Sequence, residues 1–198
     1  MMKQLGKNMK NQKGFSLAET LVALVIILLV SSIVTVGIPA AERAYYKVQE
    51  SADAQFLLST TLTELRNELA TASEISMGTD KEKPTKTKKE IKGSVVNYVN
   101  PITGVTTISF DAEKGFQITS YQDIGTYTRP LVNEKVKIQD LTLAYNEEDE
   151  DVSLFTYNAE TDTFTVAPLS VNSKISDNVA QMENSYIIRV LPPAEITD

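Results

Sequence analysis

The sequence predicts an α+β protein, in which one long N-terminal helix is followed by an antiparallel β-rich domain. Three observations lead to this prediction: residues 20–41 hold no charged side chain, residues 42–77 place apolar side chains three and four positions apart, and from residue 94 onward short segments alternate between apolar and polar side chains. Steps of three and four are the period of a helix, and a step of two is the period of a strand. We therefore expect the apolar half of the helix to span a membrane and its amphipathic half to pack on the sheet.

The composition excludes several function classes before any motif is considered. The 198 residues include no cysteine and no histidine, so thiolate or imidazole metal ligands, Cys nucleophiles and Ser-His-Asp catalysis are ruled out. The net charge of −7, from 19 basic and 26 acidic residues, does not favour general nucleic-acid binding. The sequence also has no Gly-rich phosphate-binding loop. We predict a protein that is not an enzyme and needs no cofactor.

The N-terminal segment, residues 1–14, is basic: it holds four lysines and no acid. Without it the chain has 15 basic and 26 acidic residues, a net charge of −11. The uncharged run that follows at residues 20–41 is 22 residues long, about 33 Å as a helix against about 30 Å of bilayer hydrocarbon. By the positive-inside rule, the lysines stay in the cytoplasm and the acidic remainder is exported.

Three interpretations of this N-terminal region compete: a cleaved secretory signal peptide, a plain membrane anchor, and a helix that also serves assembly. The apolar run is longer than the roughly 7–15 residues of a signal-peptide core, and the Ala-rich residues 39–41 match a cleavage site only loosely. Glu19 lies at the start of the apolar segment, where a carboxylate is costly in lipid and is therefore a functional candidate. A plain anchor has no need of it.

Residues 13–21 read KGFSLAETL, and here the chain resembles type IV pilins and the pseudopilins of type II secretion systems. That family has a short basic leader ending in Gly, then Phe, then Glu as the fifth residue of the mature chain, then an apolar helix. All four parts occur in this order, although the leader is somewhat long, and the resemblance covers roughly residues 1–45. It implies a pilin-like fold, cleavage by a prepilin peptidase between Gly14 and Phe15, and N-methylation of the Phe15 amine.

The resemblance further implies a structural subunit, favoured here as a minor one, of a type IV pilus or of a secretion- or competence-type pseudopilus. Its partners would be other pilin or pseudopilin subunits, the prepilin peptidase and, indirectly, an assembly ATPase and its platform protein. Glu19 of one subunit would pair with the Phe15 amine of the next, because either charge alone is costly in apolar surroundings. The subunit would begin as a single-pass membrane protein with a cytoplasmic N-terminus and end in a cell-surface filament. The alternative is a membrane-anchored extracellular binding module that does not polymerise.

Residues 42–77 are expected to continue the helix, and Gly78 follows as the usual residue just past a helix end. The apolar stripe of this part consists of Ala44, Val48, Ala52, Gln55, Leu58, Leu62, Leu65, Leu69 and Ala72. It could be a coiled-coil seam, but the segment is short for a free coil, which favours docking on the C-terminal domain. The opposite, charged face includes Glu42, Arg43, Lys47, Glu50, Asp53, Glu64, Arg66, Asn67 and Glu68. Pro39 interrupts the helical hydrogen bonds, which suits either a simple kink at the membrane exit or a bend that serves assembly.

Residues 78–198 are expected to form the β-rich domain. Strands are predicted at residues 94–99, 105–110, 116–121, 136–145, 152–157, 163–166 and 186–191. They are short and none alternates with a helix, which favours an antiparallel sheet. The loop at residues 80–92 holds six lysines. It could simply be soluble, could bind DNA in a competence system, or could face the acidic part of a neighbouring subunit.

The acidic run at residues 146–151 holds five carboxylates in succession. Carboxylate oxygens are the ligands that Ca²⁺ prefers, and the weak candidates are Glu148, Asp149 and Asp151. The run lacks the alternating ligands and the glycine of an EF-hand loop, and adjacent carboxylates mostly repel one another and remain in water. We therefore predict no resident metal.

Overall fold

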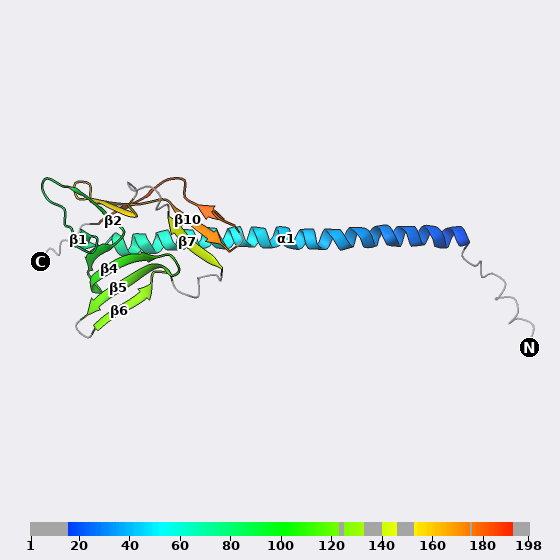
Figure 1. Cartoon of the computed structure of the whole chain (residues 1–198), viewed down its shortest axis with the longest axis horizontal. Helices are drawn as coiled ribbons and strands as arrows, with labels where there is room; N and C mark the ends of the chain where they lie inside the picture. The colour runs from blue at the N-terminus through cyan, green and yellow to red at the C-terminus, as the bar shows by residue number, and fades with distance from the viewer. Residues whose placement is uncertain (1–15, 123–124, 133–139, 146–152, 175, 192–198) are drawn as a thin grey trace, which may run out of the picture. The chain divides into compact units, whose positions relative to one another are not determined.

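The structure is a computed structural model of the whole chain, and it describes residues 16–122, 125–132, 140–145, 153–174 and 176–191. Within these residues it contains one α-helix, α1 (Leu17–Leu69), followed by β-strands only (Figure 1). The strands are β1 (Ser73–Met77), β2 (Glu90–Gly93), β3 (Val96–Asn100), β4 (Gly104–Asp111), β5 (Gly115–Gln122), β6 (Gly125–Pro130), β7 (Leu141–Tyr145), β8 (Phe155–Asn158), β9 (Thr163–Val166), β10 (Leu169–Ser173), β11 (Ala180–Gln181) and β12 (Tyr186–Arg189). The predicted α+β class is confirmed.

Contacts divide the chain into two compact units, Met1–Val48 and Gln49–Asp198. In the first unit every described residue is exposed, from Ser16 to Val48. This part of α1 includes Pro39, which lies inside the helix without ending it. A helix with apolar side chains on all sides and no protein cover is suited to lipid or to a bundle of other helices.

The second unit contains three antiparallel sheets. Their strand orders are β1-β3-β4-β5-β6, β11-β10-β7 and β12-β9-β8-β2. The β4–β5 hairpin pairs seven residues in continuous register, from Val105 opposite Tyr121 to Asp111 opposite Gly115. Gly115 has a φ of 74°, a left-handed conformation that glycine adopts without a Cβ penalty, and it closes this hairpin turn.

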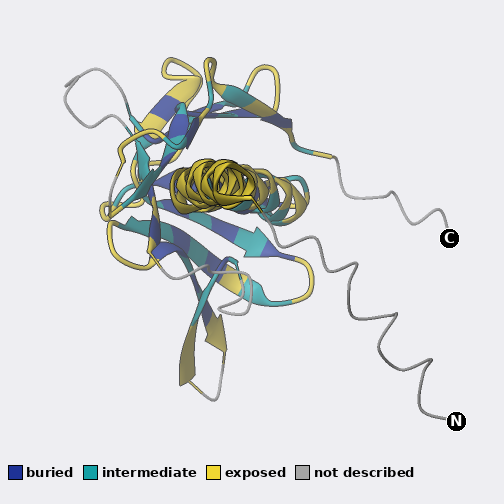
Figure 2. Cartoon of the chain, turned by 90° about the vertical axis from the view of Figure 1, so that its right-hand side faces the viewer, coloured by how far each residue is buried: buried dark blue, intermediate teal, exposed yellow. Residues whose placement is uncertain are grey.

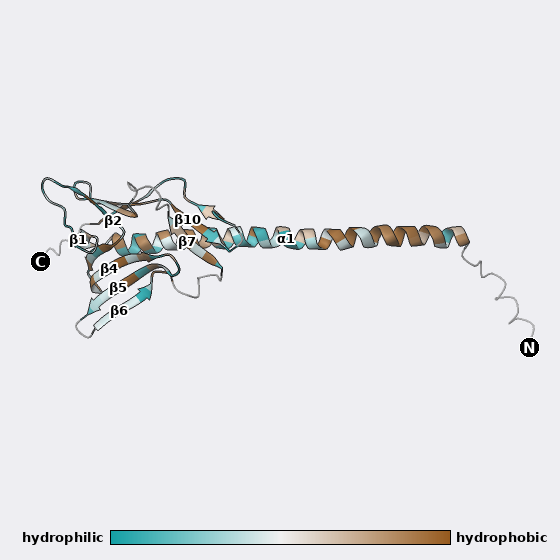
Figure 3. Ribbon diagram, in the orientation of Figure 1, coloured by the Kyte–Doolittle hydropathy of each residue, from teal (hydrophilic) through white to brown (hydrophobic). Residues whose placement is uncertain are grey.

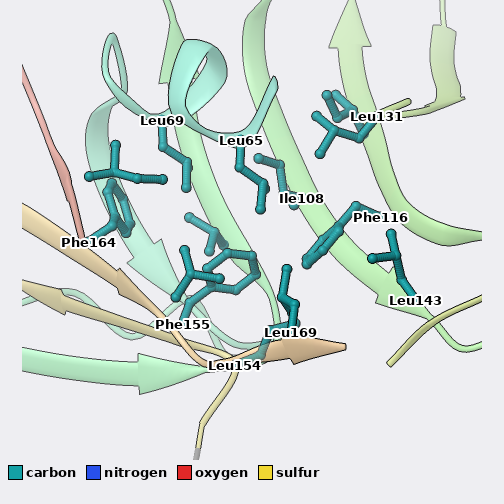
Figure 4. Packing of buried hydrophobic residues seen from close by; sticks show 14 of the residues in the cluster. Leu65, Leu69, Ile108, Phe116, Leu131, Leu143, Leu154, Phe155, Phe164 and Leu169 are labelled. Carbon is teal, nitrogen blue, oxygen red and sulfur yellow. The ribbon is translucent and has the colours of Figure 1, made fainter. Parts of the chain in front are cut away.

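The core of the second unit forms where the C-terminal part of α1 meets the sheets. Leu65 and Leu69 of the helix are fully buried, and so are Phe155 and Phe164 of the four-stranded sheet. Figure 4 shows these four side chains converging, together with Ile108 of the five-stranded sheet. Buried positions of the strands line the inner side of the domain (Figure 2). The prediction that the amphipathic part of the helix packs on antiparallel sheets is therefore confirmed.

The length of this packed helical part differs from the prediction. The buried helical residues begin at Ala54, whereas Ala44, Val48, Ala52 and Gln55 of the predicted stripe are exposed. The helix also ends at Leu69, not at residue 77, because residues 73–77 pair with β3 as strand β1. Their apolar side chains at Ile75 and Met77 are two positions apart, a strand spacing that the helical pattern upstream concealed. Glu74 has a φ of 48°, at the irregularity where β1 leaves regular pairing.

The predicted strands agree in part with those observed. Residues 163–166 form β9 with the predicted bounds, and the hairpin at residues 105–121 is present. Five strands, β1, β2, β6, β10 and β11, were not predicted. Of the strand predicted at residues 136–145, the C-terminal half is observed as β7. Residues 136–139 lie outside the described part of the chain. The Lys-rich segment is not a loop throughout, because β2 begins at Glu90.

Candidate functional site

The start of α1 brings the predicted assembly residue Glu19 into a defined local structure. Ser16 precedes the first helical residue, and its Oγ accepts a hydrogen bond from the Glu19 backbone N–H at 3.2 Å. The Ser16 carbonyl accepts a second bond from the same N–H at 2.9 Å. Ser followed three residues later by Glu is the sequence of a helix capping box, so the sequence favours a helix that begins here.

Glu19 therefore occupies the first turn of the helix, where the positive end of the helix dipole stabilises a carboxylate. Its side chain is exposed, and no hydrogen bond or ion pair to its carboxylate occurs within the described part of the chain. The next 22 residues carry no charge. A carboxylate at this place is chemically available to pair with a cation supplied by another chain.

Gly14 and Phe15, the predicted cleavage and methylation residues, lie outside the described residues. Cleavage between them and methylation of the Phe15 amine therefore stay predictions. The helix itself begins at Leu17, two positions after Phe15 in the sequence.

The apolar part of α1 is long and apolar enough to cross a membrane, and none of its most apolar window is buried in the protein. Figure 3 shows hydrophobic colour almost without interruption along the N-terminal part of the helix. Exposed large apolar side chains cover this surface and include Leu21, Val22, Leu24, Val25, Ile26, Ile27, Leu28, Leu29, Val30, Ile33, Val34, Val36 and Ile38. Exposing them to water is unfavourable, so this surface requires a lipid or protein environment.

A second constellation lies in the β-rich unit, and the sequence did not indicate it. Glu68, predicted to lie on the charged outer face, has a side chain only 15% exposed. Its Oε2 accepts hydrogen bonds from the Tyr98 hydroxyl at 3.0 Å and from Asn100 Nδ2 at 3.2 Å, and its Oε1 accepts one from Arg129 Nη2 at 2.8 Å. We call these four residues the Glu68 clasp. The clasp joins the last turn of α1 to strands β3 and β6.

The chemistry of the clasp is structural, because its acceptor sites are filled by its own donors. Burial of Tyr98 raises the pKa of its phenol well above the ordinary value, and the negative charge of Glu68 and its hydrogen bond raise the pKa further. Tyr98 therefore stays a neutral donor over the physiological pH range. A carboxylate in the last helical turn opposes the helix dipole, and the Arg129 cation offsets that cost. Residues 68, 98, 100 and 129 are far apart in the sequence, so no local motif indicates that they meet.

Three of the six lysines in the segment at residues 80–92 form ion pairs within the chain. Lys88 contacts Glu82 at 2.6 Å, Lys89 contacts Glu160 at 2.9 Å, and Lys92 contacts Glu90 at 3.5 Å. Thr85 and Lys88 also close a turn through two hydrogen bonds. Exposed pairs of this kind contribute little stability, but they reduce the free positive charge that DNA or an acidic neighbour would meet.

The weak Ca²⁺ candidates Glu148, Asp149 and Asp151 lie outside the described residues. Among the residues that the structure does describe, no group of three or more acidic side chains is placed to hold a metal ion. A small hollow beside Leu57, Thr61 and Phe116 is lined by both helix and hairpin residues, but it brings no set of convergent polar groups together.

Comparison with known proteins identifies one family pattern in the chain. The model of the prokaryotic N-terminal methylation motif matches residues 9–35. These residues span the Gly14–Phe15 junction, Glu19 and most of the uncharged run. No curated protein matches the chain, and no solved structure matches it either. The chain thus carries a pilin-type methylation motif on a long apolar helix, and it is similar to type IV pilin-like, membrane-anchored proteins.

Proposed function

We propose that the chain is a minor structural subunit of a type IV pilus or of a secretion- or competence-type pseudopilus. In this proposal a prepilin peptidase cuts between Gly14 and Phe15, the Phe15 amine is methylated, and the subunit enters the filament through α1. The observation that carries the proposal is the methylation motif at residues 9–35, on a helix whose first turn presents Glu19.

Topology and charge support this role. Four lysines precede the uncharged run, which favours a cytoplasmic N-terminus and an exported β-rich unit. When such helices leave the bilayer and pack together, the Glu19 carboxylate needs a cation, since an unpaired buried charge is costly. The amine freed at Phe15 of a neighbouring subunit would supply it. The pair would set the stagger between subunits more than it would add stability, and a motif of this type indicates a structural protein, not an enzyme.

The first experiment determines the mature N-terminus by mass spectrometry. The expected species begins with N-methylated Phe15 and lacks residues 1–14. An intact N-terminal methionine, or a cut near residue 40, would show that the chain is not processed as a pilin.

The second experiment separates processing from assembly. Glu19→Ala is expected to be cut and inserted normally but to be depleted from sheared filaments by about tenfold or more, because the loss of a buried ion-pair partner costs about 3–5 kcal/mol. Glu42→Ala is the matched control, since Glu42 is also exposed and lies at the other end of the uncharged run. Equal incorporation of both variants would refute the pairing role. The ratio of this chain to the other subunits in the same filaments tests whether it is minor.

A further inference from the structure

The helical turn beyond the uncharged run differs in composition from the segments on either side. After 22 residues without a charge comes Glu42, and the next five positions include Arg43, Tyr45, Tyr46 and Lys47. All four side chains are exposed. The two tyrosines are 66% and 65% exposed, and their rings meet edge to face with centroids 6.0 Å apart. Tyrosines and cations at the end of an apolar span are typical of a membrane–water interface.

We propose that Arg43, Tyr45, Tyr46 and Lys47 form an interfacial collar that lies in the outer headgroup layer of the membrane. The amphipathic tyrosine rings would sit at the level of the headgroups, and the two cations would bind lipid phosphates. Glu42 in the same turn reduces the net charge to +1, so the collar would depend on its aromatic rings as well as on charge. This inference takes its topology from the proposed function, with the N-terminus in the cytoplasm.

The directions of the four side chains favour lipid over a protein partner. At about 100° per residue, the positions of Tyr45, Tyr46 and Lys47 are rotated from Arg43 by about 200°, 300° and 40° around the helix axis. The four positions thus spread over an arc of about 200° around the helix and do not form a single narrow face. A docked protein contacts one side of a helix, whereas the headgroup layer contacts all sides.

The distance from the collar to Glu19 agrees with the thickness of a bilayer. Tyr45 and Glu19 are 26 residues apart, which is about 39 Å along a helix, against about 40–45 Å for a bilayer with its headgroups. With the collar in the outer headgroup layer, Glu19 lies in the inner headgroup layer, where its carboxylate stays hydrated. The collar would therefore set the depth of Glu19 in the membrane before the subunit is assembled.

The chain has no tryptophan, so a single introduced tryptophan reports its own depth. The experiment uses the full-length chain in vesicles of phosphatidylcholine and phosphatidylglycerol whose acyl chains carry bromine either near the headgroup or near the chain end. Tyr46→Trp places the reporter in the collar, and it is conservative because tryptophan also favours the interface. Val30→Trp places the reporter at the middle of the uncharged run, on an exposed position.

Shallow bromine is expected to quench Tyr46→Trp about twofold more than deep bromine, and the order should reverse for Val30→Trp. Adding Tyr45→Ala and Tyr46→Ala to the Val30→Trp chain should lower its preference for deep bromine about twofold as the helix slides. Adding Phe56→Ala is the control, because Phe56 is an exposed aromatic residue of α1 outside the collar.

Two results would overturn the collar. In the first, shallow bromine quenches Tyr46→Trp no more than deep bromine does. In the second, the quenching of Val30→Trp is the same with and without the two tyrosines. The vesicles contain no peptidase and no other pilus protein. A chain that fails to be processed in cells can therefore still show the collar, and a processed chain can lack it, so the two proposals fail separately.

Discussion

Replacing Glu68 by alanine tests whether the Glu68 clasp holds the helix on the sheet. The substitution removes three hydrogen bonds, one of them from the Arg129 guanidinium at 2.8 Å, and leaves the hydroxyl of Tyr98, a residue only 1% exposed, without its acceptor. A hydrogen bond to a charged group contributes about 1.5–3 kcal/mol, and an unsatisfied buried group costs about 1–3 kcal/mol.

These contributions are not additive. Arg129 is 40% exposed at its side chain and regains water when Glu68 is lost, so its share is discounted. We expect the free energy of unfolding to fall by about 3 kcal/mol, which for a unit of this size lowers the thermal midpoint by about 6–12 °C. Glu68→Gln keeps the shape and one acceptor oxygen, and it should lose only about 1–1.5 kcal/mol.

The assay is thermal unfolding of the full-length chain in detergent, followed by the near-ultraviolet circular dichroism of the tyrosines. Asn67→Ala is the matched control, because Asn67 is the exposed neighbour in the same helical turn. The role assigned to the clasp is wrong if Glu68→Ala and Asn67→Ala differ by less than about 0.5 kcal/mol, the usual range of surface substitutions.

Three further outcomes are expected. Burial and the hydrogen bond to Asp162 raise the pKa of Tyr157 to about 12. The contribution of Tyr157 to stability is therefore complete below about pH 10, the ordinary tyrosine value, and is lost as the pH rises toward 12. A phenolate absorbance titration in which Tyr157→Phe removes no late-titrating group would contradict this. Phe155→Ala opens a cavity in the core and should cost about 3–5 kcal/mol, whereas Ile102→Ala, at an exposed turn, should stay within about 0.5 kcal/mol. Removing Ca²⁺ with a chelator should leave the thermal midpoint unchanged, and a drop of several degrees that Glu148→Gln abolishes would instead establish a calcium site in the acidic run.

The elements that the sequence predicted well are those with a strong local pattern. The uncharged run and the hairpin around Asp111 and Gly115 are each encoded by neighbouring residues. The S-x-x-E cap at Ser16 is equally local, although it was not predicted. The helix end was misplaced because Ala72 continues the helical spacing by one step, although the chain has already left the helix at Leu69. Local spacing does not reveal that Ser73 finds a partner in Val99 of a later strand.

Glu68 could not be assigned from the sequence for the same reason. Its charge suggested an outward position, and its position next to Leu69 of the stripe was the only contrary sign. The donors that make burial of its carboxylate favourable come from residues 30, 32 and 61 positions away. The assembly residue Glu19, in contrast, depends on its place in a short linear motif, and the family model recovers that motif at residues 9–35.

The hydrogen bond from the Leu191 backbone N–H to the Ala70 carbonyl, 2.7 Å long, joins the last described strand region to the end of the helix. Chain ends are ordinarily where fraying and proteolysis start. Here the residues that follow β12 are tied to the end of the helix, so fraying of β12 from this end must break the bond to Ala70 as well as the pairing with β9. In the filament role proposed above, this hydrogen bond would help to keep the edge strand β12 in place when the subunit is under shear.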